Sequence, residues 1–362
     1  METGYTVSAR KYRPQRFEMV VGQSHITETL EHAVQSGRIP QAMLFCGPRG
    51  VGKTSCARIL AKIINESSVE LGADTSLNIF ELDAASNNSV EEIRSITDSV
   101  RIAPAVGQYK VYIIDEVHML SQAAFNAFLK TLEEPPRHAI FILATTEKHK
   151  VLPTILSRCQ IFDFKRIGVE DIASHLAFVA SKEGISAEPE ALHAIAMKAD
   201  GALRDSLSIF DRVASFAQGN ITYASVVENL QMLDHDVYFS VVDSLIAHDV
   251  PGVLVRFHQV LERGFDGHQF VIGLASHLRD VMLSVHPQTV GLMEWPATIK
   301  EKFKIQSSTA SLAFLARALR RITEAESKYK TSSNPRLLTE VALLDMAESP
   351  EYDGGDAEKK NR

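Results

Sequence analysis

Segments of strand length alternate with segments of helical spacing in the first half of the chain. The strand-like segments lie at residues 42–46, 79–82, 111–116, 139–144 and 160–164. Between them, apolar side chains recur at helical spacing in residues 54–64, 90–101 and 121–134, and Pro135-Pro136 ends the last of these helices. Strands that alternate with helices in this way predict an α/β fold with a parallel sheet.

The strand pattern fades beyond residue 166, and helical spacing continues almost to the end of the chain. Predicted helices cover residues 172–182, 189–198, 204–217 and 223–232, with breaks at Gly184, Asp200-Gly201 and Gly219-Asn220. A third block, residues 236–348, is again helical, and its apolar spacing fits a monomeric core and subunit contacts equally. The expected units are residues 1–165, 166–232 and 233–348, followed by a disordered polar tail at 349–362.

Residues 47–54 match the phosphate-binding pattern G-x-x-x-x-G-K-[ST]. The loop consists of Gly47, Pro48, Arg49, Gly50, Val51, Gly52, Lys53 and Thr54. Its glycines permit a tight turn that aims backbone N–H groups at phosphates, while Lys53 offers an ammonium and Thr54 a hydroxyl for Mg²⁺. A simple Gly-rich turn is the alternative, but the flanking strand and helix favour a site for ATP and Mg²⁺.

An acidic pair, Asp115-Glu116, ends the apolar run at residues 111–114. A carboxylate at the C-terminal end of a parallel strand lies where ligands bind in open α/β sheets, so Asp115 is the expected Mg²⁺ partner. Glu116 is placed to orient and deprotonate an attacking water. Two acids that merely cap a strand end are the alternative, which does not explain their pairing with a phosphate loop. The pair therefore predicts ATP hydrolysis.

Composition limits the remaining possibilities. With 362 residues and 45% hydrophobic side chains, the chain is long enough for two or three domains. No apolar run reaches the length of a membrane span and residues 1–13 lack the apolar core of a signal peptide, so we expect no membrane and a cytoplasmic location. The net charge of −7 argues against an overall basic coat for nucleic acid, although a local patch is compatible with it.

Several motifs together resemble the AAA+ clamp loaders, and among them the gamma/tau subunits of bacterial DNA polymerase III. They are ARKYRPQRF, VVGQ, the phosphate loop, VYIIDEVHML, SQAAFNAFLKTLEEPP, FILATT, Ser157-Arg158-Cys159 and Gly201-Ala202-Leu203-Arg204-Asp205. The resemblance covers about residues 9–346. It implies an AAA+ nucleotide-binding domain, a helical lid and a helical oligomerisation collar for the three expected units.

The same resemblance implies partners and a reaction. The chain would hydrolyse ATP within a hetero-oligomeric ring of further copies and delta-type subunits, opening a sliding clamp and placing it on primed DNA. The family is grouped with DNA-directed DNA polymerases, which are nucleotidyltransferases, but this chain shows no polymerase active site. A nucleotide-binding scaffold with little hydrolysis is the alternative. A small-molecule P-loop kinase fits less well, because it explains neither the Ser-Arg-Cys motif nor the large helical half.

Site residues follow from the resemblance as well. Arg158 resembles an arginine finger that reaches the ATP site of a neighbouring subunit, although an arginine there also fits a surface salt bridge. Arg204 resembles the second sensor, and Thr145 the first, with Thr146 as the alternative. The positions that match the adenine and ribose site, which fit an N-terminal segment packed on the core nearly as well, are Tyr12, Arg13, Pro14, Val20 and Val21.

The resemblance also implies contacts with the DNA backbone and one departure from the family. The implied DNA-binding residues are Asn87, Asn88, Ser89 and Arg94, whereas Ser89 with Glu92 also fits a helix capping box. Many relatives insert a four-cysteine zinc module before the second strand, but residues 65–78 contain no cysteine. Cys46, Cys56 and Cys159 are scattered among apolar residues, so we expect core side chains and no zinc site. The chain resembles a short gamma form or a truncated longer one.

Overall fold

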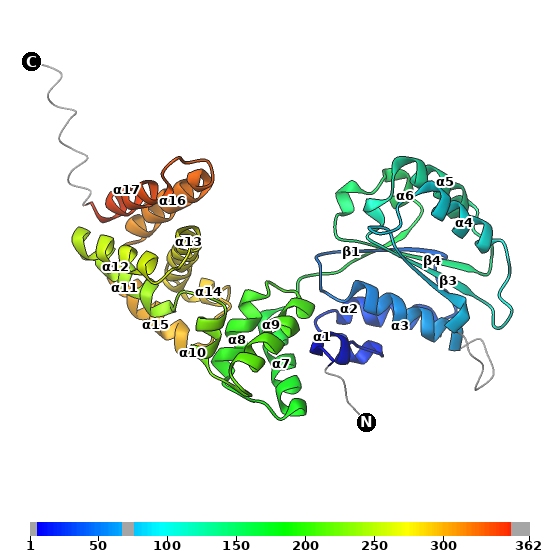
Figure 1. Ribbon diagram of the computed structural model, residues 1–362, viewed down its shortest axis with the longest axis horizontal. Helices are drawn as coiled ribbons and strands as arrows, with labels where there is room; N and C mark the ends of the chain where they lie inside the picture. The colour runs from blue at the N-terminus through cyan, green and yellow to red at the C-terminus, as the bar shows by residue number, and fades with distance from the viewer. Residues whose placement is uncertain (1–5, 67–75, 349–362) are drawn as a thin grey trace, which may run out of the picture. The chain divides into compact units, whose positions relative to one another are not determined.

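The computed structural model describes residues 6–66 and 76–348 (Figure 1). The expected disordered tail at residues 349–362 lies outside the described residues, as do residues 67–75 of the segment without cysteines. The chain forms two compact units, one up to Ile221 and one from Thr222 onward. Each unit is described by itself.

A parallel sheet organises the first unit, as the alternating pattern predicts. Its strands are β1 (Ala42–Cys46), β2 (Ile79–Asp83), β3 (Lys110–Asp115), β4 (Ala139–Thr145) and β5 (Gln160–Asp163). They are all parallel in the order β2-β3-β4-β1-β5, so β4 lies between the strand of the phosphate loop and the strand of the acidic pair. Because parallel strands end at one edge, the segments after Cys46, Asp115 and Thr145 meet there.

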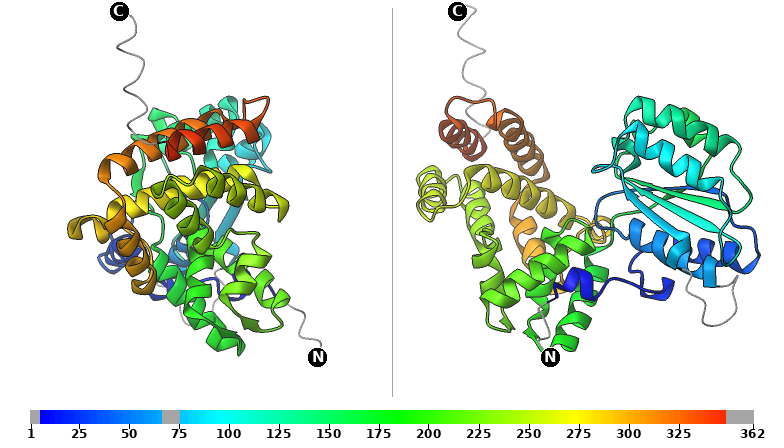
Figure 2. Two further views of the ribbon diagram at one scale, coloured as in Figure 1. Left: turned by 90° about the vertical axis from the view of Figure 1, so that its left-hand side faces the viewer. Right: turned by 45° about the vertical axis from the view of Figure 1, so that its right-hand side comes forward.

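Helices cover both faces of this sheet, which explains why the strands are apolar at consecutive positions. Figures 1 and 2 show α2 (Ser24–Gln35) and α3 (Lys53–Glu66) on one face, with α4 (Val90–Val100) and α5 (Gln122–Glu133) on the other. Met43 and Phe45 pack with helix α3, whereas Leu44 between them packs in the cluster of α5. Helix α2, which the hydrophobic pattern had not predicted, completes the first of these two layers.

Short elements and a helical group complete the first unit. The short elements are α1 (Ser8–Lys11), η1 (Phe17–Met19), η2 (Ser76–Asn78), η3 (Val117–Met119), η4 (Lys148–Lys150) and α6 (Pro153–Leu156). The helical group consists of α7 (Val169–Glu183), α8 (Pro189–Lys198) and α9 (Leu203–Phe216), with the two-residue strands β6 (Ser186–Ala187) and β7 (Asn220–Ile221). The three helices agree with the predicted ones, whereas the sequence pattern missed the small strand pair.

The described part of the second unit is entirely helical, as expected. Its helices are α10 (Tyr223–Asn229), α11 (His235–Ile246), α12 (Val250–Glu262), α13 (Gly267–Ser284), α14 (Pro287–Val290), α15 (Ala297–Thr309), α16 (Leu312–Tyr329) and α17 (Pro335–Ala347). A core of its own includes Phe257, Phe270 and Phe303. A buried polar group lies within that core, where His277 Nε2 is 2.8 Å from Gln306 Oε1 and Gln306 Nε2 donates to Asp243.

Candidate functional site

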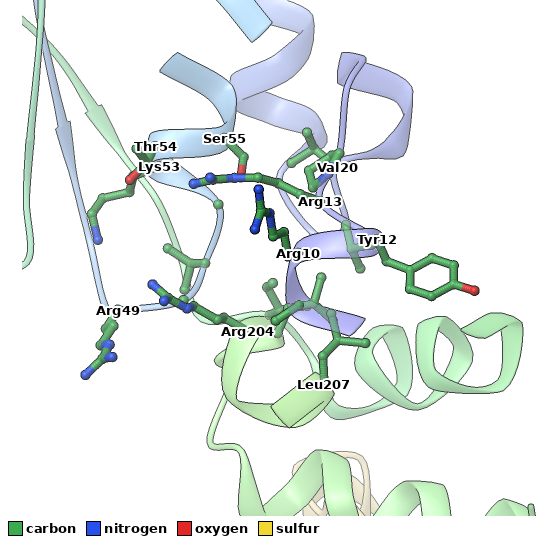
Figure 3. Close-up of a pocket in the computed structure, with 18 of the residues that line it drawn as sticks. Arg10, Tyr12, Arg13, Val20, Arg49, Lys53, Thr54, Ser55, Arg204 and Leu207 are labelled. Carbon is green, nitrogen blue, oxygen red and sulfur yellow. The ribbon is translucent and has the colours of Figure 1, made fainter. Parts of the chain in front are cut away.

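A cavity of about 480 Å³ lies in the first unit beside the phosphate loop (Figure 3). It brings together many of the residues that the sequence singled out. Those that line it are Tyr12, Arg13, Pro14, Val20, Val21, Arg49, Gly50, Val51, Gly52, Lys53, Thr54, Asp115, Glu116 and Arg204. Residues from the N-terminal segment, the sheet edge and helix α9 therefore surround one space.

The backbone of the phosphate loop needs its glycines. Gly47, Gly50 and Gly52 have φ values of 146°, 77° and 103°, which side chains other than glycine rarely adopt. A Cβ atom at Gly47 would lie 2.4 Å from the carbonyl oxygen of Phe164, and one at Gly50 would lie 3.0 Å from Cβ of Ala202. The loop is thus packed tightly between β5 and the start of helix α9.

Lys53 begins helix α3 directly after the loop. Its ammonium donates to the carbonyl oxygens of Gly47 and Pro48, each at 2.7 Å, so these two loop residues contact the lysine although they do not line the cavity. The residue is 6% exposed. Burial lowers the pKa of Lys53 below its usual value, while the carboxylates of Glu116 and Asp115 oppose that shift. The ammonium is therefore held next to the loop and is available to phosphate oxygens.

Thr54 and Asp115 meet across the sheet edge. The Thr54 hydroxyl donates to Asp115 Oδ2 at 2.7 Å, and Asp115 Oδ1 accepts the N–H of Glu116 at 3.0 Å. A hydroxyl and a carboxylate are the hard oxygen ligands that Mg²⁺ prefers, so this donor set fits the ion. The pairing joins two residues that the sequence assigned to the metal independently.

Glu116 adopts a left-handed backbone conformation, with φ 47° and ψ 45°, at the turn after β3. Its Oε2 atom accepts the N–H of Thr146 at 3.1 Å and the Thr146 hydroxyl at 3.0 Å. Thr145 is fully buried, and its hydroxyl oxygen lies 3.0 Å from Nδ1 of His118 instead. Neither threonine lines the cavity, and Thr146 is the one that contacts Glu116.

The N-terminal segment is fastened to the helical group. The N–H of Ser8 donates to Asp211 on helix α9 at 2.7 Å, and the Tyr12 hydroxyl donates to Glu183 on α7. The Tyr12 ring also packs edge-on against Phe178, with ring centres 6.4 Å apart. In Figure 3 this ring points away from the guanidinium groups in the cavity, which agrees with the packing alternative for its side chain.

Positive charge gathers in the cavity beyond the loop lysine. Figure 3 shows the side chains of Arg10, Arg13 and Arg204 directed into the same space. Arg13 Nε donates to the Ser55 hydroxyl at 3.3 Å, and burial, together with the charges of Arg58 and Arg204, lowers the pKa of Arg13. Arg10 lies within the motif ARKYRPQRF but was not assigned to the site, and Ser55 directly follows the phosphate loop and carries no motif of its own. Such a cluster favours a polyanion with several phosphates.

Arg158 lies apart from this cavity, in the segment after α6. One terminal nitrogen, Nη2, donates to Glu133 Oε1 at 2.6 Å, and Nη1 donates to the Thr154 carbonyl at 2.6 Å. Within one chain the arginine therefore forms the surface salt bridge that was the alternative to a role in a neighbouring site.

The candidate DNA-binding residues also lie outside the cavity, around the start of α4. Ser89 is the N-cap of this helix and forms a full capping box with Glu92, so the helix-cap expectation is confirmed. The N–H of Asn87 donates to the Asp83 carbonyl at 2.9 Å, and the Asn88 carbonyl accepts from Ser121 at 3.4 Å. Arg94 is exposed on α4.

The three cysteines behave as the sequence predicts. Cys46 and Cys56 are buried, and Cys159 is partly buried; all three are free thiols. Burial raises the pKa of Cys46 to about 11 and that of Cys56 and Cys159 to about 12, so none of them is an activated thiolate at neutral pH. None of the described helices is long and apolar enough to cross a membrane.

Sequence families match almost the whole length of the chain. Residues 22–168 match the family described as DNA polymerase III, delta subunit, and residues 171–219 match the ATPase lid domain of the DNA polymerase III clamp loader subunit. Residues 221–353 match domain III of the DNA polymerase III subunits gamma and tau.

Individual relatives point the same way. The chain is 39% identical to DNA polymerase III subunit tau of Bacillus subtilis, with 97% of this chain and 65% of that protein aligned. It is 40% identical to the tau subunit of Escherichia coli, over 79% of this chain and 47% of that protein. It is also 35% identical to DNA polymerase III subunit gamma of Buchnera aphidicola, over 83% of this chain and 86% of that protein.

A solved structure supports the fold alone. A RuvB variant of Thermotoga maritima is 20% identical and superposes with a TM-score of 0.50, over 65% of this chain and 80% of that one.

The chain spans 65% and 47% of the tau subunits of Bacillus subtilis and Escherichia coli. Because the gamma subunit of Buchnera aphidicola is covered over most of its length, the family is established. The chain belongs to the gamma and tau subunits of bacterial DNA polymerase III.

Proposed function

We propose that this chain is an ATP-hydrolysing motor subunit of a replicative clamp loader, which opens a sliding clamp and places it on primed DNA. The observation that carries the proposal is the joint presence of Lys53, Asp115 and Glu116 at one cavity. A protein that only bound nucleotide would need the first two residues. The third supplies a base for hydrolysis.

Substrate binding is assigned to the loop and the cationic side chains. Lys53 would move from its own loop carbonyls to the β- and γ-phosphates, since a phosphate oxygen offers the ammonium a charged acceptor in place of a neutral one. Arg13 and Arg204 add positive charge from the N-terminal segment and from α9. Thr54 and Asp115 would hold Mg²⁺, whose chemistry is to neutralise charge on the phosphates.

Glu116 is assigned the role of the base that activates water. Both donors of Thr146 go to its Oε2 atom, which leaves Oε1 for a water molecule as far as the described residues are concerned. The 29% exposure of the Glu116 side chain allows water to reach it. The same contact makes Thr146 a stronger candidate than Thr145 for the polar group that senses the state of the site.

The remaining roles depend on assembly. We assign residues 1–165 to the nucleotide-binding domain, 166–232 to the lid and 233–348 to an oligomerisation collar. Arg158 would leave Glu133 and reach the γ-phosphate in a neighbouring subunit, in a ring that includes delta-type subunits. Asn87, Asn88, Ser89 and Arg94 would contact the DNA backbone without reading sequence, in the cytoplasm where replication takes place.

Two substitutions distinguish an ATP-hydrolysing motor subunit from a scaffold that only binds nucleotide. Lys53→Ala should abolish useful ATP binding, whereas Glu116→Gln should keep binding and lose hydrolysis, because only the first removes a phosphate partner. Lys62→Ala, on the same helix but 56% exposed at its side chain, is the matched control and should behave as the parent. ATP affinity is measured on the isolated chain and turnover on the assembled loader. Parent-like ATP affinity of Lys53→Ala would contradict the assignment, and ATP binding without turnover in the parent would favour the scaffold.

A further inference from the structure

A histidine that the proposed mechanism does not use lies directly behind Glu116. His118 belongs to the short helix η3, and its side chain is 6% exposed. Its Nδ1 atom is 3.0 Å from the Thr145 hydroxyl and 3.4 Å from Glu116 Oε2, while its Nε2 atom is 3.1 Å from Glu147 Oε2. The ring therefore connects the turn after β3 to the segment after β4.

The donors and acceptors of this group determine its protonation pattern. An ionised Glu147 carboxylate only accepts, so His118 Nε2 must carry the hydrogen that points to it. In a neutral ring Nδ1 is then an acceptor, and it takes the hydrogen of the Thr145 hydroxyl. The Thr145 oxygen in turn accepts the N–H of Glu147 at 3.0 Å. These three hydrogen bonds close a loop through His118, Thr145 and Glu147 in which each donor has an acceptor.

This loop of hydrogen bonds fixes the residue that holds Glu116. Thr146 lies between Thr145 and Glu147, which are the two residues bound by His118. The N–H and hydroxyl of Thr146 both donate to Glu116 Oε2. A shift of residues 145–147 relative to η3 would therefore move the Thr146 donors away from the Glu116 carboxylate.

We propose that His118 is a positioning residue for ATP hydrolysis, which acts through Thr145 and Glu147 to keep Thr146 in register with Glu116. The proposal rests on the proposed function, since it takes Glu116 as the base that activates water. His118, Thr145 and Glu147 do not line the cavity of the phosphate loop. Loss of the network should therefore lower kcat and leave KM for ATP nearly unchanged.

A purely structural role for a buried histidine makes a different prediction. It would lower thermal stability, with kcat falling only in proportion to the folded fraction. Substitutions at Glu147 test the hydrogen-bond loop with less effect on folding, because this side chain is 36% exposed and its removal leaves no large cavity. Glu147→Gln keeps an oxygen that accepts from His118, whereas Glu147→Ala does not.

Neighbouring residues supply the controls. Lys150 donates to Glu147 Oε2 at 2.8 Å, so Lys150→Ala tests whether that ion pair alone matters. His149 lies on the same segment with its side chain 76% exposed and 3.8 Å from Glu147 Oε1, so His149→Ala is a matched control for His118.

The experiment measures steady-state ATP hydrolysis by the assembled loader with primed DNA and clamp, together with melting temperatures. We expect His118→Leu and Glu147→Ala to lower kcat about tenfold, the change that ~1.4 kcal/mol of transition-state stabilisation gives, with KM within about twofold of the parent. Glu147→Gln, Lys150→Ala and His149→Ala should stay within about twofold of the parent in both constants.

Two results overturn the proposal. One is a parent-like kcat in Glu147→Ala, which carries the test even where His118→Leu fails to fold. The other is an equal loss of kcat in Glu147→Gln and Glu147→Ala, since this would mean that charge and not the hydrogen-bond loop matters. A parent complex that does not hydrolyse ATP at all would instead refute the proposed function.

Discussion

The contact between Arg158 and Glu133 predicts a measurable restraint on hydrolysis. Arg158 Nη2 donates to Glu133 Oε1 at 2.6 Å in the single chain. If Arg158 acts in a neighbouring ATP site, it must first leave this carboxylate. The substitution Glu133→Gln keeps the shape of the side chain and removes its charge, so it should release Arg158 more readily.

The size of the effect follows from the exposure of the pair. The side chains of Arg158 and Glu133 are 33% and 46% exposed, which places the pair at the surface. Exposed ion pairs contribute about 0.2–1 kcal/mol, which corresponds to about a 1.4- to 5-fold change in the population of the released arginine. Glu133→Gln should therefore raise ATP turnover of the assembled loader by about this factor, wherever arginine insertion limits the rate.

The assay compares steady-state turnover in assembled loaders with primed DNA and clamp. Glu134→Gln is the matched control, because this residue is an exposed neighbour at the C-terminus of α5. Glu133→Gln in an Arg158→Ala background should have no effect, since the arginine it releases is absent. The gain should also shrink as salt rises, because salt screens the parent ion pair.

Two results would show that the Arg158–Glu133 pair does not restrain hydrolysis. A fall in turnover with Glu133→Gln would mean that the carboxylate assists hydrolysis. A gain that persists in the Arg158→Ala background would mean that Glu133 acts on something other than this arginine.

Three further predictions concern zinc, DNA and pH. Elemental analysis should find no stoichiometric zinc and chelators should leave the melting temperature unchanged, whereas tightly bound zinc would contradict the expected absence of a zinc site. Ser89→Ala should cost about 1 kcal/mol of stability through the lost cap, whereas Arg94→Ala should spare stability, weaken DNA binding and lower its salt slope by about one; unchanged DNA binding would remove Arg94 from the interface. Burial lowers the pKa of His277 to about 4 from an ordinary 6.5, so the unfolded chain binds the proton first and stability present above pH 6.5 is lost as pH falls toward 4. The loss is about 3 kcal/mol, and His277→Gln should flatten this part of the stability profile in denaturant titrations; an equally steep profile would contradict it.

The sheet and the cavity beside the phosphate loop could be predicted because each depends on residues that are close together in the sequence. Consecutive apolar residues such as Leu44 and Phe45 reflect strands covered on both faces, and β1 and β4 are indeed buried at every position. The glycines between Gly47 and Thr54 mark the loop in the sequence, because Gly47, Gly50 and Gly52 adopt positive φ values that other residues rarely adopt. Asp115 could be joined to Thr54 because parallel strands end at the same edge.

Other features depend on contacts that the sequence does not encode locally. The bond between Ser8 and Asp211 joins residues 203 positions apart, so nothing in the N-terminal motif indicates that α1 docks on α9. Two adjacent threonines, Thr145 and Thr146, are chemically equivalent in the sequence, and only the place where β4 ends decides which one faces Glu116. His118 lies three residues beyond Asp115, but its role as a link requires the position of the segment after β4.

Steady-state ATP turnover of the assembled loader, measured with and without primed DNA and clamp, is the decisive test of the proposed motor function. A motor subunit of this kind should hydrolyse ATP slowly without them and faster when both are present, because duplex would align neighbouring subunits and, under the proposed mechanism, bring each Arg158 to the next ATP. The stimulation should weaken as salt rises, because protein contacts with the DNA phosphates release counter-ions and this release is less favourable at high salt. Turnover that is the same with and without primed DNA and clamp, at low salt and saturating ATP, would contradict the proposed motor function.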